Sequence, residues 1–212
     1  MKISFAKNGN WQEEMYRSFI LRFDAKADFI QEEDAVADPL SDGFHGRYAY
    51  ITAVTRQQYE NGAEAALRCS FEGTGAPILM IVEDLELDAD GDGRYAACVE
   101  VVIWQHGVNV WRYTRQKDII HHYHAMADFA PLAEKEIHDL RVKVKGKHLL
   151  IQVDGKGSSV YIPDMPEKFW VGAALCEGEN RLYDLEINES KSFENFMTWS
   201  GSSEPIQKIA RP

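Results

Sequence analysis

Apolar and polar residues alternate one by one through most of residues 17–187, and this period of two constrains the fold more than any other feature. Successive side chains of a β-strand point to opposite faces of its sheet, so the alternation indicates half-buried strands. Many short strands without helical segments between them are typical of an antiparallel sandwich or barrel. The predicted strands are residues 17–24, 27–32, 46–54, 64–72, 77–83, 95–104, 108–114, 118–128, 136–145, 148–154, 158–162, 168–176 and 181–187.

The chain is expected to form one all-β domain, residues 1–188, with a C-terminal extension, residues 189–212, docked on it. In the extension, Phe193, Phe196 and Met197 stand at helical spacing, which predicts a short helical turn. Gly, Ser and Pro residues then predict a tail.

Composition excludes several classes of protein. Of the 212 residues, 45% are hydrophobic and 27% charged, and no apolar run approaches the roughly 18 residues of a membrane helix. The lack of such a run predicts no membrane partner. A net charge of −11 repels phosphate backbones, so nucleic acid is not an expected partner either. The N-terminus lacks the apolar stretch of a secretory signal, and Cys69, Cys98 and Cys176 show no disulfide or metal spacing. We therefore expect a cytoplasmic protein with reduced core cysteines.

The segment 99–114 predicts a β-hairpin whose two-residue loop is His106-Gly107. Both loop residues of a type I′ turn need positive φ, which Gly adopts freely and His adopts more often than most residues. This loop would pair Trp104 with Asn109 and Glu100 with Tyr113.

The two faces of this hairpin differ in chemistry. The aliphatic face, with Val99, Val101, Ile103 and Val110, suits the interior between two sheets, where Val142, Val144, Ile151 and Val153 are also expected. The other face either is covered by a loop, the C-terminal tail or a partner subunit, or forms a sugar-binding platform. Its predicted ligand-binding residues are Trp104, Asn109, Trp111 and Tyr113, with the carboxylate of Glu100 beside them.

The alternating strands, the hairpin 104–112 and the late segment 172–185 together resemble the concanavalin A-like lectin/glucanase superfamily, in particular a group of bacterial jelly-roll proteins. The resemblance covers roughly residues 15–188. It implies a two-sheet antiparallel jelly-roll sandwich with any ligand on the concave face. Because the superfamily holds lectins, glucanases and lyases, the resemblance selects no single activity.

The acidic segment 86–93 has three interpretations. Glu86, Asp88 and Asp90 resemble the Glu-x-Asp-x-Glu motif of family 16 glucanases, but the third carboxylate is one methylene shorter and a turn follows at once. Asp88, Asp90 and Asp92 match the start of an EF-hand loop, yet Val99 stands where its bidentate Glu belongs. A Ca²⁺ ion on these three aspartates and a solvated turn therefore both remain open.

Polar residues also gather near the last predicted turn. Glu177, Asn180 and Arg181 are candidates for the rim of a ligand site, although Arg181 could instead pair with Asp184. If a glycosidic bond is cleaved, Glu100 is the expected acid or base, with Glu177 as its partner.

His122 and His124 share one face of a predicted strand, whereas His121 points away. Two ligands do not complete a zinc site, so an exposed strand is the favoured interpretation. Two functions remain: a carbohydrate-interacting jelly roll, either lectin-like or glycoside-active, and a structural or subunit-interaction domain.

Overall fold

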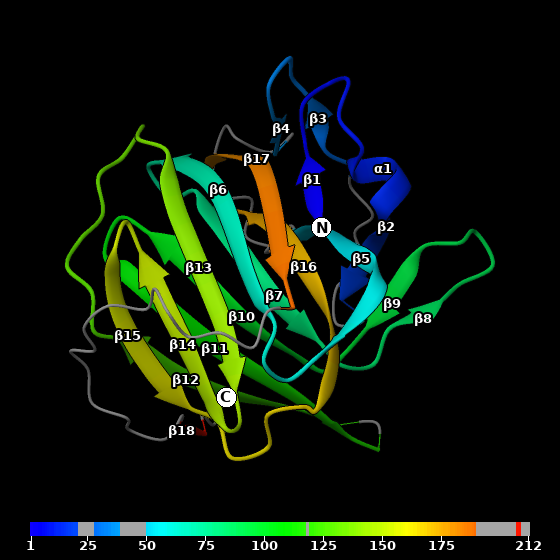
Figure 1. Cartoon of the computed structure of the whole chain (residues 1–212), viewed down its shortest axis with the longest axis vertical. Coiled ribbons are helices and arrows are strands. Elements are labelled where there is room, and N and C mark those ends of the chain that lie inside the picture. The colour runs from blue at the N-terminus through cyan, green and yellow to red at the C-terminus, as the bar shows by residue number, and fades with distance from the viewer. Residues whose placement is uncertain (21–27, 39–49, 118, 190–206, 209–212) are drawn as a thin grey trace.

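The structure is a computed structural model, and it describes residues 1–20, 28–38, 50–117, 119–189 and 207–208. The predicted helical turn at Phe193–Met197 lies outside the described residues. Within them, two β-sheets stack face to face, as Figure 1 shows.

One sheet has eight strands among the described residues. Seven run in hydrogen-bonded order, and an eighth, β1 (Lys2–Ser4), pairs with β17. The order is β15 (Lys156–Tyr161), β14 (His148–Val153), β13 (His138–Lys145), β6 (Glu64–Glu72), β17 (Glu179–Asn188), β4 (Val36–Ala37) and β3 (Ile30–Gln31).

The second sheet has ten strands in the described part of the chain. It is antiparallel except for one parallel pair, β2 with β9, which departs from the fully antiparallel sandwich that the sequence predicts. The order is β18 (Gln207–Lys208), β12 (Ile119–Ala127), β11 (Gly107–Gln116), β10 (Cys98–Trp104), β7 (Ala76–Val82), β16 (Lys168–Cys176), β5 (Tyr50–Glu60), β2 (Met15–Ile20), β9 (Gly93–Tyr95) and β8 (Glu86–Leu87).

The core lies between the sheets and contains the aliphatic residues predicted for it. Each of these eight side chains is at most 1% exposed: Val99, Val101, Ile103, Val110, Val142, Val144, Ile151 and Val153. A second apolar cluster lies on the outer face of the ten-stranded sheet and includes Ile78, Met80, Val82 and Val102. This sheet is therefore apolar on both faces along its central strands.

The described residues contain one helix, α1 (Trp11–Glu14), a single turn that leads into β2. No helix in the described residues is long and apolar enough to cross a membrane. The three cysteines are buried, as predicted, and the described residues contain no disulfide. The two-residue strand β18 pairs with β12 at a position where the sequence predicted only a tail.

Candidate functional site

The β10–β11 hairpin turns one residue earlier than predicted. Trp104 pairs with Gly107, so Gln105 and His106 form the loop, and Glu100 lies opposite Trp111 rather than Tyr113. Of the residues at this turn, Gln105 to Gly107, only Gly107 has a positive φ, of 120°. His106 therefore does not adopt the left-handed backbone that the predicted turn required. The predicted register was therefore wrong by two residues.

A shift of two residues leaves every side chain on its predicted face, because side chains alternate with a period of two. Trp104, Asn109, Trp111 and Tyr113 do lie on the outer face of the ten-stranded sheet, beside Glu100. Their exposure is graded. Glu100 is 0% and Tyr113 1% exposed, whereas the other three are half-buried.

The neighbouring strand β12 adds two histidines to this face. His124 lies opposite Trp111, and His122 lies opposite Tyr113. We call the set Trp104, Asn109, Trp111, Tyr113, His122 and His124 the aromatic strip. The sequence indicated that the two histidines share a face, but it suggested an exposed strand or metal ligands rather than part of a sugar-binding surface.

Four rings of the aromatic strip, those of Trp111, Tyr113, His122 and His124, contact one another along β11 and across to β12. Trp111 is nearly parallel to Tyr113, with an interplanar angle of 8° and a centroid distance of 6.4 Å. The His124 ring lies 4.3 Å from the Trp111 ring, and the His122 ring lies edge-on to Tyr113 at 5.0 Å. The ring orientations are therefore held by neighbours as well as by the sheet.

Polar atoms lie beside these rings. His124 Nε2 and Asn109 Oδ1 are 3.0 Å apart, which orients both side chains. Burial lowers the pKa of His124, which favours the neutral imidazole, whose two nitrogens are one donor and one acceptor. Within the described part of the chain, Trp104 Nε1 is a buried donor that has no hydrogen-bond acceptor.

Of the rim residues, Asn180 contacts Glu177, whereas Arg181 binds other partners. Asn180 is 1% exposed and donates to the backbone oxygens of Glu177 and Gly178. Arg181 donates instead to Glu32 and Glu179, so the expected pair with Asp184 is not formed, and Asp184 accepts from Arg68.

Glu177 and Glu100 are not brought together either. Met80 lies opposite both Glu100 and Gly172, and Glu177 follows Gly172 by five residues. At about 3.3 Å per residue this displacement is about 17 Å along the strand. Glycosidase carboxyl pairs are about 5–9.5 Å apart, so these two residues cannot act as such a pair.

The three aspartates of the acidic loop do converge. One carboxylate oxygen from each of Asp88, Asp90 and Asp92 lies within 4.8 Å of the others. Arginines already bind two of these groups: Arg94 donates to Asp88 Oδ2, and Arg17 donates to both oxygens of Asp92. Asp88 Oδ1 also accepts the backbone N–H groups of Asp90 and Asp92. Desolvation alone would raise the pKa of Asp88, but these bonds together lower it. A cation would have to share the carboxylates of Asp88 and Asp92 with the two arginines.

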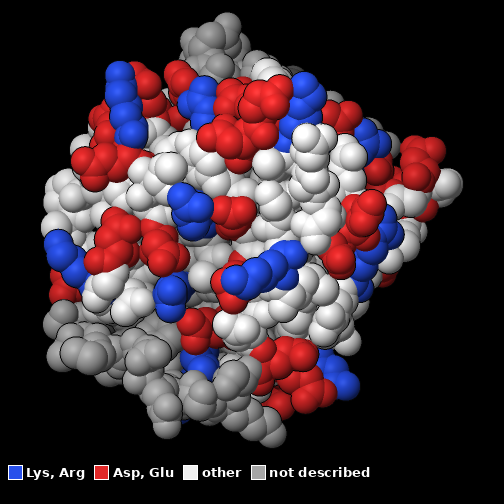
Figure 2. All heavy atoms as spheres, turned by 45° about the horizontal axis from the view of Figure 1, so that its top comes forward, with Lys and Arg blue, Asp and Glu red and all other residues white. Residues whose placement is uncertain are grey.

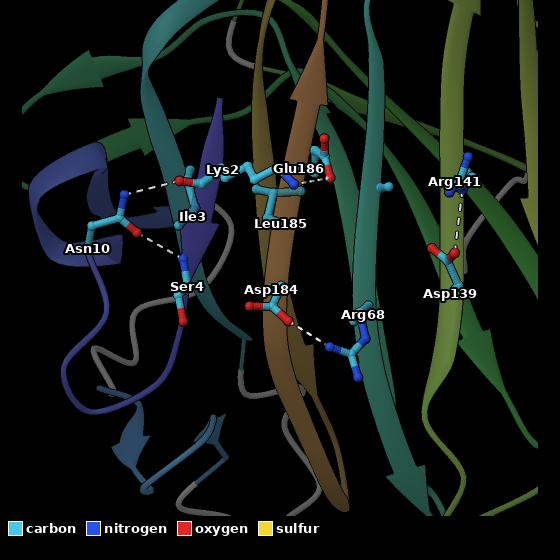
Figure 3. Close-up of a pocket in the computed structure, with 11 residues that line it drawn as sticks. Lys2, Ile3, Ser4, Asn10, Arg68, Asp139, Arg141, Asp184, Leu185 and Glu186 are labelled. Atoms are coloured by element: carbon cyan, nitrogen blue, oxygen red, sulfur yellow. Dashed lines mark hydrogen bonds and ion pairs between the residues drawn. The ribbon is translucent and has the colours of Figure 1, made fainter.

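A cavity of about 520 Å³ opens on the opposite side of the sandwich, over β1, β17, β6 and β13 (Figure 3). Its charged side chains form ion pairs, with N–O distances of 3.4 Å for Lys2–Glu186, 2.9 Å for Arg68–Asp184 and 3.4 Å for Arg141–Asp139. Figure 2 shows acidic and basic side chains intermingled on the face that it presents. None of the described residues that line this cavity is aromatic, so it offers no ring on which a sugar could stack.

The two stacked sheets match solved domains of the concanavalin A-like lectin/glucanase fold, which confirms the resemblance at the level of the fold alone. The legume lectin-like domain from Entamoeba histolytica matches with a TM-score of 0.57 and 14% identity, over 89% of this chain and 97% of that chain. The exoplasmic/lumenal domain of VIP36, solved in a Ca²⁺/Man3GlcNAc-bound form, matches with a TM-score of 0.51 and 11% identity, over 76% of this chain and 81% of that chain. The carbohydrate binding module CBM66 from Bacillus subtilis matches with a TM-score of 0.50 and 11% identity, over 76% of this chain and 90% of that chain. No family model matches the sequence, and no curated protein does.

Proposed function

We propose that the chain binds carbohydrate on the outer face of the ten-stranded sheet, at the aromatic strip. The apolar face of a pyranose ring stacks on indole and phenol rings, while amides and imidazoles bind its hydroxyls. The aromatic strip offers both kinds of group on adjacent strands of one sheet. The observation that most supports the proposal is the half-buried Trp111 ring, which contacts the same His124 that Asn109 orients.

Two further features support this assignment. Trp104 Nε1 has no acceptor among the described residues, and because this atom is buried, a ligand oxygen would supply one only after the indole turned outward. The structural relatives include a domain solved with Man3GlcNAc and a module named for carbohydrate binding.

The proposal is for binding rather than hydrolysis. Glu100 is fully buried, and Glu177 is too far from it to act as the second carboxylate. A lectin-like protein needs no catalytic pair.

An array of neutral and acidic glycans tests the proposal. The wild type is expected to bind at least one class of glycan. Trp104→Ala is expected to weaken that binding, because it removes both a ring and the unpaired donor. The control is Tyr183→Ala, a half-buried aromatic on β17 of the other sheet, which should bind as the wild type does. An array on which the wild type binds nothing contradicts the proposal.

The second candidate is a structural or subunit-interaction face. The burial of Glu100 and Tyr113 favours it, because that end of the face is already removed from water. A glycan would then reach only Trp104, Asn109 and Trp111, which are half-buried. The melting temperature of Trp111→Ala separates the two candidates, because a structural face predicts a large fall and a sugar-binding face predicts little change.

We also propose that Ca²⁺ binds the loop of Asp88, Asp90 and Asp92 with low affinity. The convergence of three carboxylates and the Ca²⁺-bound form of the VIP36 relative support a cation here. Competition from Arg17 and Arg94 places the expected dissociation constant at about 10⁻⁴–10⁻³ M or weaker.

A further inference from the structure

A second cavity, of about 480 Å³, lies at one edge of the sandwich, where α1, β2 and the segment before β3 meet. Volumes of this size are typical of small-ligand sites. Its lining combines three aromatic rings, Trp11, Tyr16 and Phe29, with charged and amide side chains.

The aromatic wall of the cavity is fixed by its neighbours. Trp11 lies edge-on to Phe29, with a centroid distance of 5.4 Å, and near Phe5 at 6.1 Å. Its Nε1 donates to Gln31 Oε1 at 3.1 Å, and the Gln31 amide in turn donates to three backbone oxygens. The indole is therefore positioned before any ligand arrives, which reduces the entropy cost of binding.

The polar wall is fixed by Arg17. Its Nε and Nη2 donate to the two oxygens of Asp92, at 2.9 and 2.7 Å. Its Nη1 donates to both oxygens of Asp28, at 2.8 and 2.9 Å. A carboxylate has about four lone-pair sites, so Asp28, whose side chain is 65% exposed, keeps capacity to accept further donors.

Arg56 supplies donors on the other side. Its guanidinium stacks on the Tyr16 ring, 4.3 Å from the centroid, and donates to the backbone oxygens of Glu13 and Gln12 at 2.8 and 3.4 Å. A guanidinium has five N–H donors, so these two bonds leave others for a ligand.

We propose that this cavity is a second ligand site, and that its ligand is a neutral sugar residue. The two arginines and the two aspartates that line it cancel in charge, so the lining attracts neither an anion nor a cation overall. A hydroxyl group both donates and accepts hydrogen bonds, and it therefore matches Asp28 and Arg56 together. Trp11 and Phe29 provide apolar surface for the ring.

The second site is independent of the aromatic strip. Five steps in strand order separate β11 from β2, which corresponds to about 24 Å at about 4.8 Å per strand. Either site can therefore exist without the other.

The test follows the indole N–H signals of the ¹⁵N-labelled chain while neutral glucan tetrasaccharides, β-1,3 and β-1,4 linked, are added to millimolar concentration. Trp→Phe variants assign the signals. The Trp11 signal is expected to shift, and Arg56→Ala and Gln12→Ala should each weaken this response, with Arg56→Ala raising the dissociation constant about tenfold. Arg68→Ala, an exposed arginine on the other sheet, is the matched control and should leave the response unchanged.

Three results would overturn the inference: no shift at Trp11 with either sugar, an unchanged response in both cavity variants, or a stronger response to tetragalacturonate than to neutral sugars. Signals of Trp104 and Trp111 report separately on the aromatic strip. A shift at Trp11 alone would support the second site while contradicting the proposed function, and the reverse pattern would contradict only the second site.

Discussion

The imidazole of His124 lies 4.3 Å from the indole of Trp111, ring centre to ring centre, and its Nε2 is 3.0 Å from Asn109 Oδ1. One histidine thus connects the ring that would stack on a sugar with the amide that would bind its hydroxyls. Trp111 on β11 and His124 on β12 lie directly opposite each other.

His124→Ala should therefore weaken glycan binding by about tenfold, the effect of losing about 1.4 kcal/mol of interaction. Calorimetric titration with the best glycan of the array measures it. His121→Ala is the matched control, because His121 is the half-buried histidine on the opposite face of the same strand. Equal affinities for the two variants would contradict a role for His124.

The lowered pKa of His124 also predicts a pH dependence of stability. Burial lowers this pKa from its ordinary value of 6.5, so below that value the unfolded chain binds a proton that the native chain does not. Unfolding therefore becomes easier as the pH falls. Urea unfolding at about pH 7 and about pH 5 should show a larger loss of stability for the wild type than for His124→Asn. Equal losses of stability in the wild type and in His124→Asn would show that His124 does not contribute to the pH dependence.

Arg112 is expected to be the most important ion-pair residue for stability. It is 2% exposed, it pairs with Glu83 and Asp164, and it donates to Tyr113 O at 2.9 Å. Arg112→Ala leaves a partly buried carboxylate unpaired and should cost about 3–5 kcal/mol in urea unfolding.

The matched control for Arg112→Ala is Arg68→Ala, which breaks the exposed pair with Asp184 and should cost about 0–1 kcal/mol. Similar costs for the two variants would contradict the prediction.

The acidic loop should respond to Ca²⁺ only weakly in the wild type and more strongly in Arg17→Ala. The variant removes the guanidinium that binds both oxygens of Asp92, so the ion meets less competition. Calorimetry with millimolar Ca²⁺ measures the difference. No heat and no melting shift in either protein would exclude the cation site.

The sequence predicted the long strands well because a half-buried strand of six or more residues shows its alternation clearly. The strands it missed, β1, β4, β8, β9 and β18, have two or three residues each, too few for a period to appear. Each of these short strands is defined by the strand that pairs with it, and the local sequence does not show which strand that is.

The candidate site was predicted in part. The faces of the hairpin were correct although its register was wrong by two, because an even shift preserves the face of every residue. Which strand lies beside β11 depends on the fold as a whole, so the local pattern could not bring His124 to Trp111. For the same reason the sequence could not show that Arg181 meets Glu32, 149 positions away.

The most direct test of the account is a pair of measurements on Trp111→Ala: glycan affinity by calorimetry and the thermal melting curve. Sugar binding at the aromatic strip predicts that glycan affinity falls below detection while the melting temperature changes little, because Trp111 is half-buried at the edge of the outer cluster. A purely structural tryptophan would instead cost about 3–5 kcal/mol of stability on truncation. A collapsed melting temperature, together with no glycan bound by the wild type, would contradict the account.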